Sequence, residues 1–209
     1  PMARSKSSDR WLARHFKDEY VKRAQQEGFR SRAAYKLMEI DERDRLLRPG
    51  MTVVDLGAAP GGWSQYARRR LGSSGRILAL DILPMEPLDG VESLQGDFTE
   101  PAVLDSLIER LGGKPVDLVI ADMAPNISGI GVVDQARAMG LAKLALEFAD
   151  KALRPGGDLL VKTFQGAGFQ EFYREMQHRF AKLVTRKPKA SRAESRETYL
   201  LGRGFKAAA

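Results

Sequence analysis

The feature that most constrains the fold is a regular alternation, from residue 50 onward, of short apolar runs with amphipathic stretches. The apolar runs are five to seven residues long and carry many β-branched side chains, which is typical of strands. We expect strands at 52–56, 76–81, 91–95, 116–121, 158–164, 182–186 and 197–203. We expect helices at 62–71, 101–111, 134–153 and 168–180. This order predicts an α/β fold with a mostly parallel seven-stranded sheet, helices on both faces and an antiparallel closure by the last strands.

The 209 residues suit a single domain with one well-formed core. Residues 1–47 form an N-terminal extension, because 9–47 have the pattern of two charged helices and no strand. The core spans 48–205, and we expect the terminal residues 206–209 to be disordered.

Composition narrows the partners and the chemistry. The net charge of +7 favours a negatively charged partner, with nucleic acid first and an acidic membrane second. No apolar run reaches the roughly 20 residues that span a bilayer, so we expect no membrane association. The chain has no cysteine, which excludes disulfides and thiolate chemistry and suits a reducing cytoplasm. Its two histidines, His15 and His178, lack carboxylates at ligand spacing, so we expect no metal site.

A glycine-rich turn at 53–67, "VVDLGAAPGGWSQYA", lies between the first core strand and the next helix. Asp55 ends the expected strand, and Gly57, Gly61 and Gly62 allow the backbone to approach a ligand closely. The spacing is neither the G-x-G-x-x-G of dehydrogenases nor a Walker A loop, so a phosphate-bearing ligand loses support. S-adenosylmethionine, which has a ribose and an adenine but no phosphate, fits the turn better.

Two acidic residues follow the next two strands. Asp81 and Asp97 stand where a carboxylate accepts the hydroxyls of a ribose. Each could instead be a helix N-cap or a turn residue. Their combination with the glycine-rich turn strengthens the prediction of S-adenosylmethionine binding.

The methyl acceptor should be determined by the residues after the fourth strand, "ADMAPNISG" at 121–129. Asp122 lacks the following aromatic residue with which amino-group methyltransferases stack a base, and no cysteine is present for attack on a pyrimidine, so an oxygen acceptor remains. Lys162, in the apolar run "LLVKTF", could be the general base for a hydroxyl. It could equally reach solvent from the strand end or pair with Asp122.

At several places the sequence resembles the FtsJ family of heat-shock ribosomal RNA methyltransferases. The matching segments cover nearly the whole chain: "RSRAAYKLMEI" (30–40), "VVDLGAAPGGWSQY" (53–66), "GDF" (96–98), "DMAPN" with the following "SG" (122–129), "VKTFQG" (161–166) and "SRAESRETYL" (191–200). The resemblance implies a Rossmann-like methyltransferase fold that uses S-adenosylmethionine to methylate a ribose 2′-hydroxyl, with S-adenosylhomocysteine as product. It also implies a uridine target in the aminoacyl-site loop of 23S rRNA, within an assembled large ribosomal subunit.

The resemblance further implies a catalytic tetrad of Lys36, Asp122, Lys162 and Glu197. Lys162 would be the general base, held by Asp122 and Glu197. Lys36 would orient the ribose or, through its like charge, disfavour a proton on Lys162. Alternatively, alignment of the reactants in a site without water would provide most of the rate acceleration. The expected cofactor-binding set is Asp55, Gly57, Pro60, Gly61, Gly62, Trp63, Asp81, Asp97 and Asp122.

Basic residues near the predicted site suggest how RNA would be held. They form three clusters: Arg4, Lys6, Arg10 and Arg14; Arg30, Arg32 and Lys36; and Arg186, Lys187, Lys189, Arg192 and Arg196. We expect phosphate contacts from these clusters and base stacking on Phe29 or Tyr35. Three other functions stay open: a tRNA or mRNA-cap 2′-O-methyltransferase, a non-catalytic ribosome assembly factor, and, less favoured, a dehydrogenase. We expect a monomer.

Overall fold

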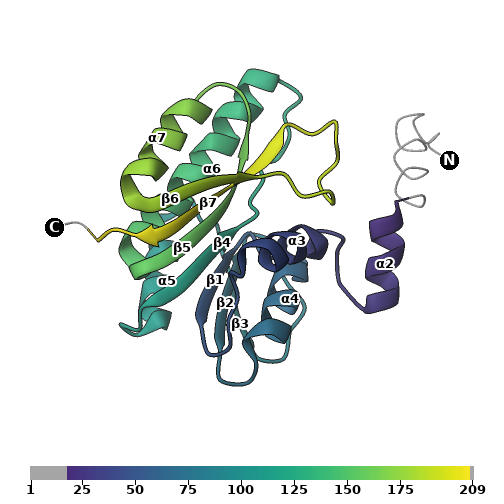
Figure 1. Cartoon of the computed structure of the whole chain (residues 1–209), viewed down its shortest axis with the longest axis vertical. Helices are drawn as coiled ribbons and strands as arrows, with labels where there is room; N and C mark the ends of the chain where they lie inside the picture. Colours follow the sequence, from purple (N-terminus) through teal and green to yellow (C-terminus); the bar gives the residue numbers. More distant parts are fainter. Residues whose placement is uncertain (1–17, 208–209) are drawn as a thin grey trace.

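The computed structural model describes residues 18–207, built around one seven-stranded sheet (Figure 1). The strands are β1 (Thr52–Leu56), β2 (Arg76–Asp81), β3 (Val91–Gln95), β4 (Val116–Ala121), β5 (Leu153–Phe164), β6 (Phe180–Arg186) and β7 (Glu197–Phe205). Their order across the sheet is β3-β2-β1-β4-β5-β7-β6. Neighbours from β3 to β5 are parallel, and β7 runs antiparallel to both β5 and β6. The predicted fold class and the antiparallel closure are confirmed.

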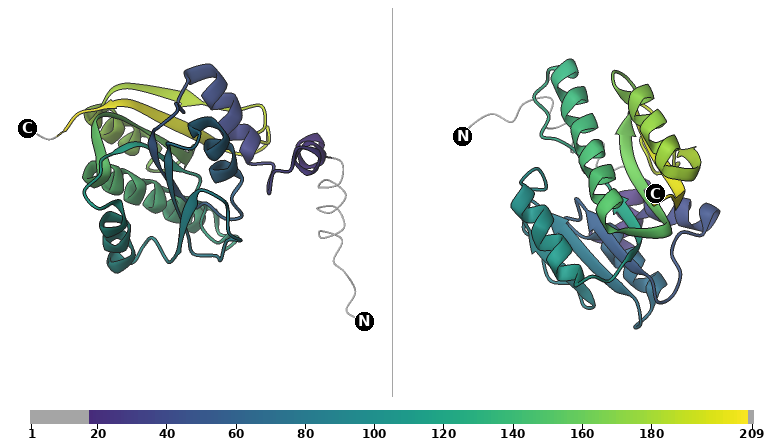
Figure 2. Two further views of the ribbon diagram at one scale, coloured as in Figure 1. Left: turned by 90° about the horizontal axis from the view of Figure 1, so that it is seen from below. Right: turned by 90° about the vertical axis from the view of Figure 1, so that its left-hand side faces the viewer.

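Helices cover both faces of the sheet. They are α2 (Glu19–Glu27), α3 (Ala34–Asp44), α4 (Gly62–Leu71), α5 (Pro101–Leu111), α6 (Gly131–Ala152) and α7 (Phe169–Arg179). Figures 1 and 2 show α5, α6 and α7 on one face, and α3 and α4 on the other. Because successive strand residues point to opposite faces, Val53 and Val54 belong to the two different apolar clusters. The second cluster, which includes Val53, lies between the sheet and the helices α3 and α4.

The N-terminal extension packs on the core through α3. Tyr35, Leu37 and Ile40 are buried and share an apolar cluster with sheet residues. The helix before it, α2, begins at the N-cap Asp18, whose carboxylate accepts a hydrogen bond from the Tyr20 amide at 2.9 Å. The two helices expected at 9–47 are therefore observed from residue 18 onward, and the first basic cluster lies outside the described residues.

Several boundaries differ from the prediction. Strand β5 begins at Leu153 rather than 158, because Leu153 already pairs with Val116 before a register shift that accommodates the Pro-Gly segment. Helix α6 begins at residue 131 rather than 134. Strand β1 has its predicted bounds, so Asp55 is its penultimate residue rather than its last. Of the tail expected to be disordered, Lys206 donates its amide to the Arg179 carbonyl at 2.8 Å, and residues 208–209 lie outside the described residues.

Candidate active site

The four tetrad residues come from four elements that meet at the carboxyl edge of the parallel strands. Asp122 directly follows β4, and Lys162 lies near the end of β5. Glu197 begins β7, where the antiparallel register places Tyr199 opposite Lys162 and Glu197 opposite Phe164. Because side chains two residues apart point to the same face, Glu197 and Tyr199 both lie on the face that Lys162 occupies. The fourth member, Lys36, reaches this face from α3.

The tetrad forms two ion pairs that are mostly shielded from solvent. Lys36 Nζ lies 2.6 Å from Glu197 Oε1, and Lys162 Nζ lies 3.2 Å from Asp122 Oδ1. The four side chains are only 9–14% exposed. Burial would raise the pKa of the Glu197 carboxyl, but the charge and hydrogen bond of Lys36 and the charge of Lys162 outweigh burial and lower it. Glu197 is therefore an ionised partner for Lys36.

This pairing modifies the arrangement that the resemblance implied. Within residues 18–207, the ion-pair partner of Lys162 is Asp122 alone. Glu197 instead binds Lys36 and also accepts a hydrogen bond from Ser191 Oγ at 2.8 Å. Lys162 is thus held by one carboxylate and influenced by the second only through its charge.

Sequence reasoning missed Tyr199, which completes the site. Its hydroxyl donates to Asp122 Oδ1 at 2.7 Å, the same oxygen that Lys162 approaches. Burial, with the nearby charges of Asp122 and Glu197, raises the pKa of the Tyr199 hydroxyl well above its ordinary value, so the hydroxyl stays protonated and donates. Its ring packs against Trp63, with centroids 5.8 Å apart. The available signal was its position two residues after Glu197 in a strand.

We predict that Tyr199→Phe lowers kcat about 10-fold, because a hydrogen bond to a charged group contributes about 1.5–3 kcal/mol. The retained ring should preserve the packing against Trp63, so the melting temperature should change little. Tyr35→Phe is the matched control, since that buried tyrosine donates to Glu27 away from the tetrad. Equal kcat values for the two variants would contradict a role for Tyr199 in orienting Asp122.

The glycine-rich turn forms a backbone cradle beside the tetrad. A Cβ on Gly57 would lie 2.7 Å from Met123 Cγ, and one on Gly62 would lie 2.8 Å from Ser31 Oγ. Gly57 and Gly61 have φ values of 76° and 118°, which favour glycine. Pro60 lies within the turn, and its carbonyl accepts a hydrogen bond from Arg30 Nη1 at 3.1 Å. At Gly57 and Gly62 the turn therefore has no room for a side chain, because neighbouring protein atoms fill the space, and the turn leads straight into α4.

Trp63 lies in the first turn of α4, but its indole does not face a ligand. The ring is 2% exposed, and Nε1 donates to the Ala33 carbonyl at 2.8 Å. Only its backbone N–H, at the N-terminal end of the helix, is placed to serve a ligand. The side chain instead joins α3 to the turn.

The two predicted ribose-binding carboxylates lie in different surroundings. Asp81 accepts the Ala59 amide at 2.9 Å and the Leu83 amide at 2.8 Å, so it links the end of β2 to the glycine-rich turn. Asp97 accepts from both the amide and the hydroxyl of Thr99. Both are therefore turn residues, as one reading of the sequence allowed. Each carboxylate keeps spare lone pairs for the hydroxyls of a ligand.

Asp55 is fully buried beneath the turn rather than open to a ligand. Its Oδ2 accepts from Ser64 Oγ at 2.7 Å, and Oδ1 has no partner within the described residues. Burial, together with the charges of Asp122 and Asp81, raises the pKa of Asp55 to about 7 despite the Ser64 hydrogen bond. Asp55 acts on the site as a support of the turn and as a nearby titrating group.

This pKa predicts a stability that falls with pH. The folded-state pKa of about 7 exceeds the ordinary value of 3.8, so the native state holds a proton that the unfolded chain has released. The contribution is complete below about pH 4 and is lost as the pH rises through about 7, amounting to about 4 kcal/mol at most. Asp55→Asn keeps an acceptor for Ser64, so its urea stability should lack this decline between pH 4 and 8. Parallel curves for the two proteins would refute the assignment.

The surface predicted to hold RNA needs two corrections. Phe29 and Tyr35 are 6% and 1% exposed and pack edge to face, so neither ring can stack on a base. The Arg30 guanidinium donates hydrogen bonds to the carbonyl oxygens of Pro60, Glu86 and Pro87, so it is engaged within the protein rather than by a phosphate. The rings are buried because their side of the extension packs on the core, whereas the sequence placed them only by their proximity to basic residues.

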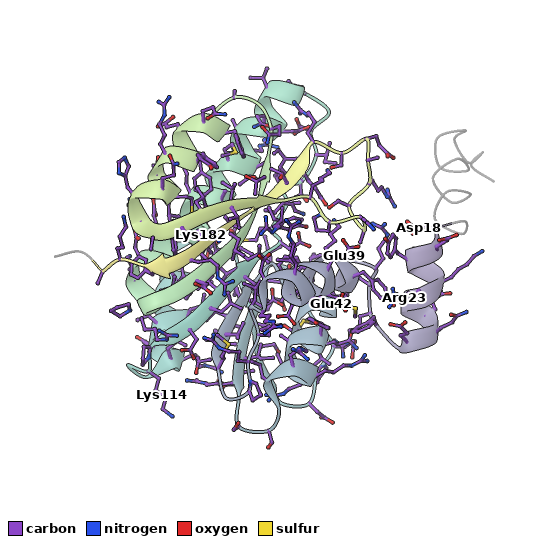
Figure 3. All side chains as sticks on the ribbon, viewed as in Figure 1. Asp18, Arg23, Glu39, Glu42, Lys114 and Lys182 are labelled. Carbon is purple, nitrogen blue, oxygen red and sulfur yellow. The ribbon has the colours of Figure 1, made fainter. Side chains whose placement is uncertain are left out.

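The loop between β6 and β7, residues 187–196, keeps exposed cations. Lys189, Arg192 and Arg196 are exposed. The loop is anchored to α3, because Glu39 accepts the Lys189 and Ala190 amides and Arg32 donates to the Ala190 carbonyl. Figure 3 shows Glu39 on α3, and also Asp18, which pairs with Arg32 at 2.9 Å. The anchored loop ends at Glu197 and so brings positive charge to the tetrad.

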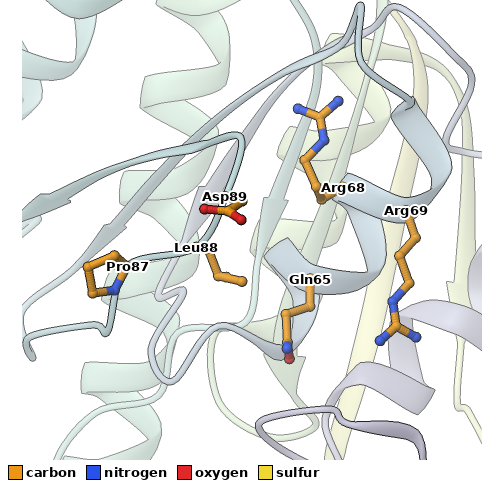
Figure 4. Close-up of a pocket in the computed structure, with 6 residues that line it drawn as sticks. All are labelled: Gln65, Arg68, Arg69, Pro87, Leu88 and Asp89. Carbon is orange, nitrogen blue, oxygen red and sulfur yellow. The ribbon is translucent and has the colours of Figure 1, made fainter.

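A pocket separate from this site lies between α4 and the loop after β2 (Figure 4). Its lining consists of Gln65, Arg68, Arg69, Pro87, Leu88 and Asp89. None of these belongs to the tetrad or to the predicted cofactor set. Across residues 18–207, no cluster of acidic or histidine side chains could hold a metal ion. Nor does any helix of that segment combine the length and hydrophobicity needed to cross a bilayer.

Comparisons with known proteins match the chain over most of its length. A sequence model of the FtsJ-like methyltransferases matches residues 29–205. A protein of Alkalilimnicola ehrlichii named ribosomal RNA large subunit methyltransferase E is 61% identical over 202 residues, covering 97% of each chain. A protein of the same name from Azoarcus sp. is 63% identical over 201 residues, covering 96% of this chain and 98% of the relative. The crystal structure of a Plasmodium falciparum protein described as a putative ribosomal RNA methyltransferase is 28% identical. It aligns with a TM-score of 0.76, over 86% of this chain and all of that one.

Proposed function

This chain belongs to the FtsJ-like methyltransferase family, and from that premise we propose that it methylates the ribose 2′-hydroxyl of a uridine in 23S rRNA with S-adenosylmethionine. The target is a uridine of the aminoacyl-site loop in an assembled large subunit, and the enzyme acts in the cytoplasm as a monomer. The observation that carries the proposal is the pairing of two shielded lysines with two carboxylates, beside a glycine cradle at the carboxyl edge of the sheet.

The residues at this edge fit S-adenosylmethionine. Gly57, Gly61 and Gly62 let the turn pack closely against neighbouring protein segments, which fixes its backbone for a closely held ligand. Asp81 and Asp97 provide acceptors for ribose hydroxyls, and Asp122 provides a carboxylate for the amino group of the methionine part. The N-terminal end of α4 adds free backbone N–H groups for the carboxylate of the ligand.

Lys162 is the proposed proton acceptor. When bound, S-adenosylmethionine supplies a methyl group on a positively charged sulfur, which is a strong electrophile. In its neutral form, the Lys162 amine would take the proton of the ribose 2′-hydroxyl as the methyl group passes from sulfur to the ribose oxygen. Asp122 and Tyr199 fix the position of Lys162, and Lys36, held by Glu197, orients the ribose. Alignment of the two reactants in a shielded site adds to the rate.

An RNA acceptor is supported by charge and by the relatives. The chain carries a net charge of +7, and Lys189, Arg192 and Arg196 are exposed on the loop that leads to Glu197. Cations of this kind bind phosphates and make affinity depend on salt. The relatives from Alkalilimnicola ehrlichii and Azoarcus sp. are named for action on large-subunit ribosomal RNA.

The test is transfer of labelled methyl from S-adenosylmethionine to large ribosomal subunits taken from a methyl-deficient strain. Protein-free 23S rRNA, tRNA and capped mRNA are offered in parallel, and cofactor binding is measured by calorimetry. We expect labelling of the subunits above all other substrates. Labelling of tRNA or of the cap alone would assign the enzyme to another RNA substrate. Cofactor binding without transfer to any RNA would favour an assembly factor.

A further inference from the structure

Exposed aliphatic side chains gather on the loop between β4 and α6. Within residues 18–207, large hydrophobic side chains are strongly exposed at only two places, the loop after β2 and this one. Here Ile127 is 85% exposed, Ile130 60% and Val132, at the start of α6, 81%. Single exposed aliphatic residues are ordinary, but three within six residues of one loop form a patch that solvation alone does not favour.

Hydrogen bonds hold this patch in its exposed position. Asp134, in the first turn of α6, accepts the Ser128 amide at 2.8 Å, the Ser128 hydroxyl at 2.7 Å and the Gly129 amide at 3.2 Å. The Ile130 amide in turn donates to Ser128 Oγ at 3.1 Å. These bonds tie the loop to the helix, so the isoleucines on either side of Ser128 cannot fold inward without breaking them.

The loop that carries the patch and the basic loop adjoin the two strands that flank β5, the strand of Lys162. The β4–α6 loop begins at Asp122, and the β6–β7 loop ends at Glu197. Each loop therefore has one end at a tetrad residue, at the same edge of the sheet. One border of the site is therefore aliphatic and the other carries Lys189, Arg192 and Arg196. A nucleic-acid strand has this same division, with phosphates on one side and apolar base faces on the other.

We propose that Ile127, Ile130 and Val132 contact the bases next to the target nucleotide of the substrate RNA, while the β6–β7 loop binds phosphates. The inference rests on the proposed function and adds the surface by which the substrate is held. The proposed target lies in an RNA loop, and single-stranded loops present unstacked bases whose faces are exposed to water. Aliphatic side chains inserted beside such bases replace part of the lost stacking.

The experiment compares Ile127→Ser/Ile130→Ser with Ile127→Leu/Ile130→Leu on large subunits. We expect the serine variant to lose on the order of 10-fold in kcat/KM for subunits, because it removes apolar area that the bound RNA would bury. The leucine variant should retain wild-type activity. Cofactor affinity and melting temperature should be unchanged in both, because neither side chain is part of the core.

Salt dependence separates the two borders of the site. The serine variant should keep the wild-type slope of log KM against log salt, whereas Lys189→Ala/Arg192→Ala should reduce that slope, because only the cations release counterions. A photoreactive side chain at position 127 should crosslink to RNA.

Two results would overturn the inference. If the wild-type enzyme is active on subunits and the serine variant has the same kcat/KM, the proposed base contact is excluded. The proposed function would stay intact. Crosslinking from position 127 to a ribosomal protein would assign the patch to a protein partner instead. Absence of methyl transfer by the wild-type enzyme to any RNA would overturn the proposed function and the inference together.

Discussion

Lys162→Ala should lower the rate of methyl transfer about 10²- to 10⁴-fold, the range that a positioned general base contributes. The variant loses the proton acceptor and leaves Asp122 without its cation, although Tyr199 still donates to that carboxylate. Single-turnover transfer to large subunits measures the chemical step, and calorimetry should show that the cofactor still binds.

Lys162→Arg is the matched control, because it keeps a positive charge near Asp122 but cannot give up a proton near neutral pH. If Lys162 acts as a base, the arginine variant should be nearly as slow as the alanine variant at every pH. Recovery of most of the wild-type rate by arginine would show that charge and alignment suffice. Proton removal by Lys162 would then be excluded as the source of the rate.

Gly57→Ala should weaken S-adenosylmethionine binding at least about 10-fold, since a Cβ here forces the turn and the following loop apart. The new carbon would lie 2.7 Å from Met123 Cγ and 3.0 Å from Met123 Cα, and the backbone atom cannot move without shifting Asp122 beside it. The φ of 76° adds strain of about 1–2 kcal/mol. Calorimetric titration measures the affinity, and urea unfolding measures the strain.

Gly112→Ala separates strain from steric conflict. Gly112 also has a positive φ, 60°, but a Cβ there meets nothing within 4 Å. It should lose a similar amount of stability to backbone strain and bind the cofactor normally. If both variants bound with the wild-type affinity, the turn around Gly57 would not be the cofactor cradle.

The periodicity of the sequence was sufficient to predict the strands of the sheet. Each expected strand and core helix is present, because alternation in a strand and the spacing of apolar residues in a helix are local properties. The element boundaries that were predicted wrongly depend on contacts between residues that are distant in the sequence. Leu153 joins β5 because Val116 is available to pair with it, and no local pattern reports that partner. The segment at 155–157, Pro-Gly-Gly, is absorbed as an irregularity in the strand.

The site was predictable in its members but not in its pairing. The resemblance supplied the tetrad but not its pairing. Lys162 pairs with Asp122 because the β4–β5 register places Ala121 opposite Val161, and Glu197 is brought to the same site by the β5–β7 register. The β5–β7 register also places Tyr199 opposite Lys162 in the site. The prediction that Phe29 and Tyr35 stack on a base failed for a related reason, since burial of the extension depends on how it packs rather than on its composition.

The most direct test of the proposed reaction is alkaline hydrolysis of large-subunit RNA that the enzyme has labelled. A 2′-O-methyl group removes the hydroxyl that attacks the neighbouring phosphodiester, so the bond after the methylated nucleotide survives alkali. We predict that the label appears in an alkali-stable dinucleotide whose first nucleoside is 2′-O-methyluridine. Label recovered in mononucleotides would place the methyl group on a base and would contradict ribose methylation by the Lys162 site.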